Sequence, residues 1–166
     1  MLLTIASLAL TLGGADTPPV PLLGGVTPDR VAAATRPSRS VHASSIRRAA
    51  TIPPRLRPWA ACVLRRESGG TLADPTSGMG ARNESSSASG RWQFLDSQWR
   101  RGLSYMVADR LRDHGVPRPT ARVIRLHLAA TPIHRWPAPY QDAGFVEVVE
   151  RGGAFHWRGP GCGMPR

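Results

Sequence analysis

The sequence predicts a small, mostly helical domain that is closed by one disulfide and preceded by an unfolded linker. Helical periodicity begins near Pro58 and recurs through much of the remaining chain. Two cysteines, Cys62 and Cys162, lie almost at the two ends of that periodic region. The stretch before it is rich in Pro, Ala, Ser, Thr and Arg and shows no persistent period. We therefore expect a folded domain over residues 58–162 behind a disordered linker over residues 16–57.

The first helix is predicted by four positions at spacings i, i+3, i+4 and i+7, which share one helical face. These positions are Ala60, Val63, Leu64 and Glu67. Gly69 and Gly70 end this helix. Glu67 therefore lies on the last turn of an apolar stripe, where loss of water disfavours an ionised carboxylate. Arg65 and Arg66 are close enough in sequence to offset that effect, depending on their distances.

Two further helices are predicted by N-cap residues followed by apolar stripes. One begins at Asp96 or Ser97, both good N-cap residues, and continues to Gly115. Thr120 could cap the other, over residues 121–130. The domain is thus expected to be helical after its first loop.

The segment over residues 140–151 is compatible with a short strand or a helix. The Gly152-Gly153 pair that follows favours the helix. Long loops are expected over residues 71–90 and 131–139, so the predicted helices are separated by extended connections.

The N-terminus has the order of a secretory signal. An apolar stretch over residues 2–12 is followed by Gly13, Gly14 and Ala15, which predicts a signal peptide over residues 1–15. No basic residue precedes the apolar stretch, so a start further upstream and a coincidental apolar beginning stay open. No apolar run reaches the roughly 20 residues that a membrane-spanning helix needs. We expect an exported protein without a transmembrane segment.

Export makes a disulfide between Cys62 and Cys162 the favoured interpretation, against two buried free thiols in a cytosolic protein. Closing a loop of about 100 residues stabilises the fold by at most about 4–5 kcal/mol in the chain-entropy model. The histidines show no metal-ligand spacing and are interpreted as surface or packing residues. They are His42, His114, His127, His134 and His156. We expect no metal and no cofactor, and a short tail over residues 163–166.

Three motifs suggest chemistry on a sugar. They are Glu67-Ser-Gly-Gly70, then Gly90-Arg-Trp-Gln-Phe94, then Ser97-x-Trp99. A lone carboxylic acid at the end of an apolar helix face can protonate a glycosidic oxygen if a hydrophobic pocket keeps it neutral. Nearby aromatic rings offer flat faces to sugars, and a glutamine can bind their hydroxyl or acetamido groups.

These motifs, in this order, resemble the catalytic core of the actinobacterial transglycosylase-like domains, which include the resuscitation-promoting factors. The resemblance covers residues 59–99 and continues through Gly159-x-Gly-Cys162. It implies a lysozyme-like α+β fold and cleavage of the β-1,4 bond between N-acetylmuramic acid and N-acetylglucosamine in peptidoglycan. By motif match, Glu67 is the catalytic acid/base, Gln93 lines the substrate cleft, and Cys62 and Cys162 form the family's bridge.

The chain departs from the family pattern in the loop over residues 71–89 and in a long segment over residues 130–157. Trp92, Trp136 and Tyr140 are the candidate sugar platforms, although large aromatics such as Trp92 also suit a small core. Gln93 could equally bind a loop backbone. The carboxylates nearest in sequence to the candidate acid are Asp74, Glu84 and Asp96. None stands out as a second catalytic group, which fits a single-acid lytic mechanism and leaves hydrolysis open.

The net charge of +11 comes from 22 arginines without a lysine. It points to a polyanionic partner or to the codon bias of a GC-rich genome. The arginines are spread over linker and domain without a helix-turn-helix or zinc-finger spacing, which argues against nucleic acid. For an exported protein, anionic cell-wall polymers fit better.

The predicted function is that of a monomeric, secreted, cell-wall-associated enzyme that cleaves peptidoglycan glycan strands, as a lytic transglycosylase or a muramidase. A phage-encoded version would be virion-associated. The first alternative is a non-catalytic peptidoglycan-binding or virion-associated module of the same fold. The second is a basic nucleic-acid-binding protein.

Overall fold

The computed structural model describes residues 39–164, which form five α-helices, three short 3-10 helices and one two-stranded sheet. The helices are α2 (Arg39–Ala50), α3 (Arg57–Ser68), α4 (Asp96–Asp113), α5 (Arg118–Ala130) and α6 (Ala138–Glu150). The 3-10 helices span Pro54–Leu56, Ile133–Arg135 and Gly153–Trp157. Strand β1 (Ala88–Ser89) pairs antiparallel with β2 (Phe94–Leu95). The expected mostly helical architecture is confirmed, and a small two-stranded sheet accompanies the helices; the expected signal peptide lies outside the described residues.

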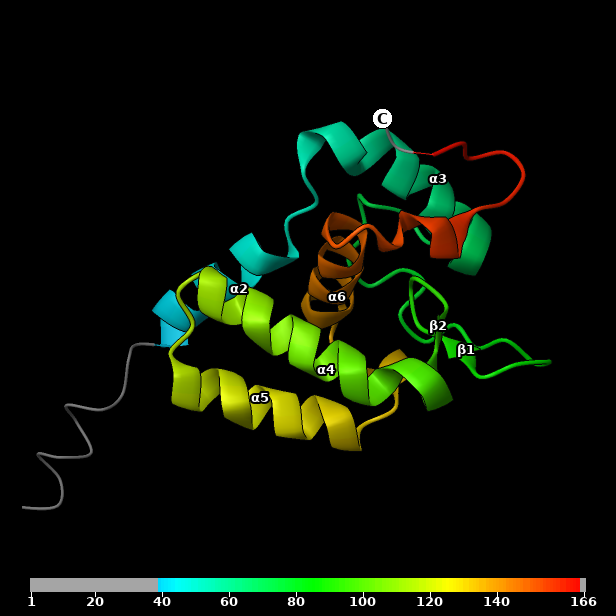
Figure 1. Ribbon diagram of the computed structural model, residues 1–166. Coiled ribbons are helices and arrows are strands. Elements are labelled where there is room, and N and C mark those ends of the chain that lie inside the picture. Colours follow the sequence, from blue (N-terminus) through cyan, green and yellow to red (C-terminus); the bar gives the residue numbers. More distant parts are fainter. Residues whose placement is uncertain (1–38, 165–166) are drawn as a thin grey trace, which may run out of the picture. The chain divides into compact units, whose positions relative to one another are not determined.

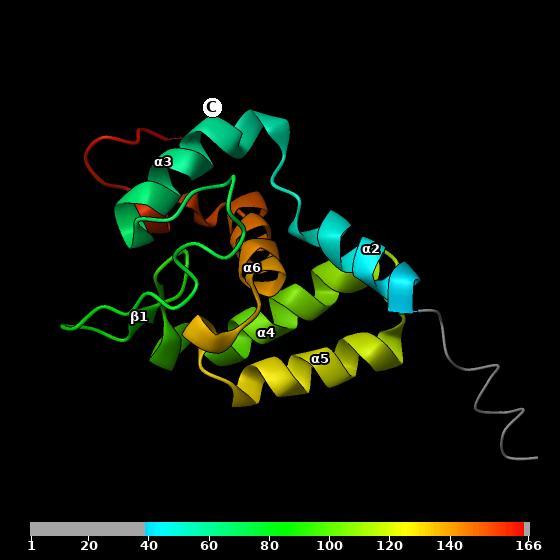
Figure 2. The ribbon, with the colours of Figure 1, turned by 180° about the vertical axis from the view of Figure 1, so that it is seen from behind.

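The long helices pack around α6 and α4. Helices α4 and α5 run antiparallel side by side, joined by a short turn, and α6 packs against α4 and α2 (Figures 1 and 2). The chain after α6 turns back toward α3, so the two ends of the predicted 58–162 region meet (Figure 1). Within residues 39–164, no helix is both long and apolar enough to cross a bilayer.

The folded part begins earlier than the sequence predicted. Residues 39–57 were expected to belong to the unfolded linker, but they form α2 and a 3-10 turn that pack against the core. Ala49 is fully buried, and Leu56 is 4% exposed. The buried Arg110 donates from Nε to the carbonyl of Ala49 at 2.6 Å, which fastens the end of α2 to α4. The linker prediction is therefore wrong for residues 39–57, and residues 16–38 lie outside the described part.

Two predicted helix caps are replaced by other contacts. Helix α4 begins at Asp96 itself, and no side chain caps it. The Asp96 carboxylate instead accepts from the backbone N–H of Ile133 at 2.7 Å and pairs with Arg100 at 2.7 Å. Helix α5 begins at Arg118, two residues before the expected cap at Thr120, because a proline at its second position suits a first turn. The helical interpretation of residues 140–151 is confirmed by α6.

Aromatic rings form the centre of the core. Phe145 of α6 stacks on Trp92 with ring centroids 3.6 Å apart. Trp157 meets Phe145 and Phe94 edge to face, with centroids at 4.9 and 5.4 Å. Trp59 of α3 also stacks on Phe145, with ring centroids 5.7 Å apart. One phenylalanine of α6 thus joins α3, the hairpin and the last 3-10 helix.

The predicted disulfide is present. Cys62 of α3 and Cys162 are bonded, with Cα atoms 5.6 Å apart and 100 positions between them in sequence. The Trp59 indole N–H also donates to the carbonyl of Gly163 at 2.9 Å. Both contacts fasten the C-terminal segment to α3.

Replacing Leu56 by alanine should lower the free energy of unfolding by about 2–5 kcal/mol, because the change leaves a cavity in the core. Urea denaturation measures this. The matched control is Leu126→Ala, whose parent side chain is 51% exposed and should cost less than about 0.5 kcal/mol. Equal midpoints for parent and Leu56→Ala would mean that residues before α3 do not belong to the cooperative fold.

Reducing the disulfide should lower the free energy of unfolding by up to about 4–5 kcal/mol, since a loop of this length regains its freedom in the unfolded chain. Thermal unfolding with and without dithiothreitol measures the effect. The Cys62→Ser/Cys162→Ser double variant is the control, because its midpoint should not respond to the reductant.

Candidate functional site

Glu67 lies on the last turn of α3, and its side chain is 25% exposed. The helix ends as the glycine pair predicted: Gly69 adopts a left-handed conformation with φ 69°, and its N–H donates to the carbonyl of Arg65. A quarter-exposed carboxyl at a helix end is accessible to a ligand without any unfolding of the helix.

Arg66 holds one oxygen of Glu67. Its Nε and Nη2 atoms both donate to Oε1, at 3.0 and 2.7 Å. The same Nη2 donates to the carbonyl of Trp157 at 2.7 Å. Among the described residues, none donates a hydrogen bond to Oε2 of Glu67. The carboxyl group is therefore anchored at one oxygen and free at the other.

The Gly-rich loop after α3 lies directly against the end of that helix. A Cβ on Gly78 would come within 2.3 Å of the Ser68 hydroxyl, and one on Gly70 within 2.9 Å of the Ser77 carbonyl. Gly78 also has a positive φ of 73°, which other residues rarely adopt. Glycine at these positions lets the loop pack closely against Ser68 and Leu64 of α3.

A buried arginine fixes the other end of this loop. Arg91 is 1% exposed and its Nε pairs with Asp142 of α6 at 3.0 Å. Its Nη1 donates to the carbonyls of Asp74, Pro75 and Ser77 at 3.1, 2.9 and 2.6 Å. Burial raises the pKa of Asp142, because loss of water outweighs the attraction of Arg91. The loop over residues 71–78 is thus bound to α6 through one guanidinium group.

The Gly90–Phe94 motif is held by the same helix. Gln141 is fully buried on α6. Its side-chain oxygen accepts from the backbone N–H of Arg91 at 2.7 Å, and its side-chain nitrogen donates to the Trp136 carbonyl at 2.7 Å. A Cβ on Gly90 would come within 2.3 Å of the Gln141 side-chain oxygen, so this position requires glycine. The roles of Gln141 and Asp142 were not predicted from the sequence. The one sequence feature that could have indicated them is a pair of polar residues at the start of an apolar helix.

Gln93 binds the backbone of its own loop, which was the alternative to lining a substrate cleft. Its side-chain nitrogen donates to the carbonyl of Gly90 at 3.0 Å, and its φ is 52°. Gln93 therefore stabilises the turn between β1 and β2.

Two of the three candidate sugar platforms are core residues. Trp92 and Trp136 are 0% exposed. Their indole N–H groups donate to the Asp142 carboxylate at 2.9 Å and to the Thr131 carbonyl at 2.7 Å. The interpretation of both as sugar platforms is wrong, because neither presents a ring face to solvent. Tyr140 is half-buried, and burial raises its pKa.

Aromatic side chains reach the surface elsewhere. Phe155 is 52% exposed, and its ring lies 4.1 Å from that of the exposed His156. His156 meets Trp99 edge to face at 4.7 Å. His156 also precedes Trp157, whose carbonyl binds Arg66. His156 was predicted to be a surface or packing residue, but its contact with the partly buried Trp99 was not predicted.

The other carboxylates near the motifs have structural partners or lie in the loop. Hydrogen bonds from the Thr76 hydroxyl and N–H lower the pKa of Asp74. Asp96 pairs with Arg100, and Glu84 lies exposed in the loop before β1. In residues 39–164, no cluster of three His, Cys, Asp or Glu side chains could hold a metal ion.

A pocket of about 350 Å³ lies between α3 and the C-terminal segment, and its lining includes Arg65, Arg66 and the disulfide. A second, of about 380 Å³, lies beside Arg91 and Asp142, and a third, of about 730 Å³, lies between α4 and α5. Glu67 lines none of these three. No protein-family profile, no curated protein and no solved structure matches this chain. The function is therefore inferred from the residues and their geometry.

Asp142→Asn should lower the free energy of unfolding by about 3–5 kcal/mol, because it leaves the buried Arg91 charge uncompensated. Because the asparagine amide still offers an acceptor to the Trp92 indole N–H, the drop in the free energy of unfolding measures the effect of removing the negative charge. Asp109→Asn is the control: its partner Arg112 is exposed, and the change should cost less than about 1 kcal/mol. Equal losses in urea denaturation would contradict the role given to Arg91.

Proposed function

We propose that this chain is a peptidoglycan-cleaving enzyme with a lysozyme-like fold, in which Glu67 is the general acid/base. Its substrate is the β-1,4 bond between N-acetylmuramic acid and N-acetylglucosamine. The proposal starts from the resemblance of the three motifs to actinobacterial transglycosylase-like domains. A secreted, cell-wall-associated protein that acts as a monomer fits that substrate.

The observation that carries the proposal is the asymmetry of the Glu67 carboxyl. Oε1 is held by Arg66, whereas Oε2 has no donor among the described residues and belongs to a side chain that is 25% exposed. A general acid needs one oxygen free to exchange a proton with substrate and a fixed orientation from the rest of its surroundings. Glu67 has both.

In the proposed reaction, protonated Glu67 gives its proton to the glycosidic oxygen as the bond from that oxygen to the muramic acid C1 breaks. The resulting Glu67 carboxylate then removes a proton from the nucleophile that attacks C1. If the nucleophile is a hydroxyl of the same sugar, an anhydro end forms; if it is water, a reducing end forms. The cycle leaves Glu67 protonated again in both cases.

A single-acid mechanism is favoured by the partners of the carboxylates that lie nearest to Glu67 in the sequence. Asp74 accepts from Thr76 and Asp96 pairs with Arg100, whereas Glu84 lies exposed in the loop before β1. A retaining or inverting hydrolase would need a second carboxyl at about 5 Å or about 6.5–9.5 Å. An intramolecular hydroxyl attack needs no such partner, which favours the lytic transglycosylase.

The exposed aromatic group is the better candidate for sugar stacking. Trp99, Phe155 and His156 present ring surface to solvent, whereas Trp92 and Trp136 do not. Sugar rings bind on flat apolar faces, and exposed aromatics of this size are costly without a ligand. We assign substrate contact to this group in place of the buried tryptophans.

The ion pair with Arg66 favours a second candidate, a non-catalytic peptidoglycan-binding or virion-associated module of the same fold. Arg66 engages Oε1 of Glu67 through two guanidinium N–H groups, and such a charge-assisted pair also suits a carboxylate with a purely structural role at the end of α3. Such a module would sediment with cell walls and release no fragments.

Glu67→Gln should reduce release of soluble fragments from purified peptidoglycan by about 10²–10⁴-fold, the contribution typical of general acid–base catalysis. The full-length chain is incubated with peptidoglycan, and the products are separated and weighed by mass spectrometry. Anhydro ends indicate the lytic mechanism, and reducing ends indicate hydrolysis.

Asp113→Asn is the matched control, because Asp113 is an exposed carboxylate at the far end of α4. It should release fragments at the parental rate. Unchanged release by a folded Glu67→Gln variant would remove Glu67 from the chemistry. Wall binding by the parent without any release would establish the non-catalytic module.

A further inference from the structure

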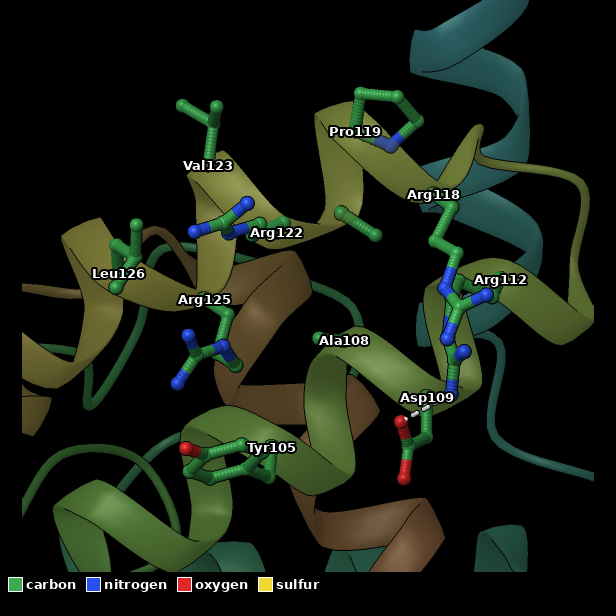
Figure 3. Close-up of a pocket in the computed structure, with 11 residues that line it drawn as sticks. Tyr105, Ala108, Asp109, Arg112, Arg118, Pro119, Arg122, Val123, Arg125 and Leu126 are labelled. Atoms are coloured by element: carbon green, nitrogen blue, oxygen red, sulfur yellow. Dashed lines mark hydrogen bonds and ion pairs between the residues drawn. The ribbon is translucent and has the colours of Figure 1, made fainter.

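Helix α5 carries an exposed apolar stripe. Pro119, Val123 and Leu126 follow one another at i, i+4 and i+7, so they share one helical face. Val123 is 66% and Leu126 51% exposed. Figure 3 shows both side chains projecting away from α4. Large apolar side chains gathered on one outward face indicate contact with another surface.

Three arginines flank this stripe at the same spacing. Arg118, Arg122 and Arg125 each precede a member of the stripe by one position, so they lie along its edge. The ion pairs found in residues 39–164 include none of these three. The sequence of α5 contains no acidic residue. Their charge is therefore available to an external anion.

The neighbouring helix completes this surface. Tyr105 of α4 is 51% exposed, and the Arg125 guanidinium lies over its ring at 4.2 Å (Figure 3). That stacking fixes the guanidinium and leaves its edge free for hydrogen bonds. The pocket of about 730 Å³ between α4 and α5 has one acidic lining residue, Asp109. It is already paired with Arg112 at 2.5 Å.

We propose that the exposed face of α5 binds the surface of an anionic lipid bilayer. Val123 and Leu126 would enter the headgroup region, and Arg118, Arg122 and Arg125 would bind lipid phosphates from the edge. An outward apolar stripe with a basic flank is the pattern of helices that lie in a membrane interface. Nucleic acid is less suited, because its phosphates would leave Val123 and Leu126 at the centre of a polar contact.

The test is sedimentation of the full-length chain with vesicles at physiological salt. One set of vesicles is phosphatidylcholine alone, and the other contains equal parts phosphatidylcholine and phosphatidylglycerol. The parent should sediment with the anionic vesicles and stay in solution with the neutral ones. Every variant keeps the apolar N-terminal stretch over residues 2–12, so differences between variants report on the helix surface.

The charge variant is Arg118→Gln/Arg122→Gln/Arg125→Gln. Each arginine near an anionic surface strengthens binding roughly fivefold, so the triple variant should bind on the order of 100-fold more weakly. The matched control, Arg101→Gln/Arg135→Gln/Arg158→Gln, removes the same charge from exposed positions elsewhere and should keep most of the affinity. Equal losses in the two triple variants would overturn the proposal, as would equal binding to both vesicle types.

The apolar variant is Val123→Ser/Leu126→Ser, which should weaken vesicle binding roughly 10-fold because apolar area is no longer buried. Phe155→Ser is its control, with similar exposure on another surface, and should bind as the parent does. Parental binding by the Val123/Leu126 variant would show adhesion by charge alone to any polyanion and would overturn the proposal. Circular dichroism of each variant verifies the fold, and none of these measurements depends on peptidoglycan cleavage.

Discussion

The buried guanidinium of Arg91 is the interaction on which the site depends. The Arg91 side chain is 1% exposed, so its guanidinium donors must find acceptors within the fold. Its partners are Asp142 on α6 and carbonyls of the loop over residues 71–78. The loop is therefore held to α6, and Gly78 packs against Ser68 at the end of α3, the residue that follows Glu67.

The local features of the site were predictable, but its long-range partners were not. The helix carrying Glu67, its end at Gly69 and the disulfide follow from spacing, glycine chemistry and cysteine placement. The role of Trp92 depends on Phe145 and Asp142 of α6, about 50 positions later in the chain. A short motif containing a tryptophan and a glutamine has the same composition whether it lines a cleft or forms a packed turn, so only tertiary contacts decide between the two.

Helix α2 was not predicted from the sequence, for a different physical reason. Its buried positions are Ser45 and Ala49, which contribute little to an apolar pattern. The surrounding arginines and prolines give the segment the composition of a linker. Polar contacts add to this small apolar area: Arg110 donates to the Ala49 carbonyl at 2.6 Å, and Arg48 donates to the His114 carbonyl at 3.3 Å. Small residues allow close approach, and hydrogen bonds then replace the missing apolar area.

The Arg66–Glu67 pair can be reconciled with an acid role for Glu67 by the second contact of Arg66. A guanidinium held only by Glu67 would lose its position whenever the carboxyl took up a proton. Arg66 also donates to the carbonyl of Trp157, a residue packed in the aromatic core, so its place does not depend on the charge of Glu67. Gly159 closes over the same guanidinium, where a Cβ would come within 2.7 Å. In the proposed reaction, protonation of Glu67 would therefore leave the arginine in place beside the carboxyl.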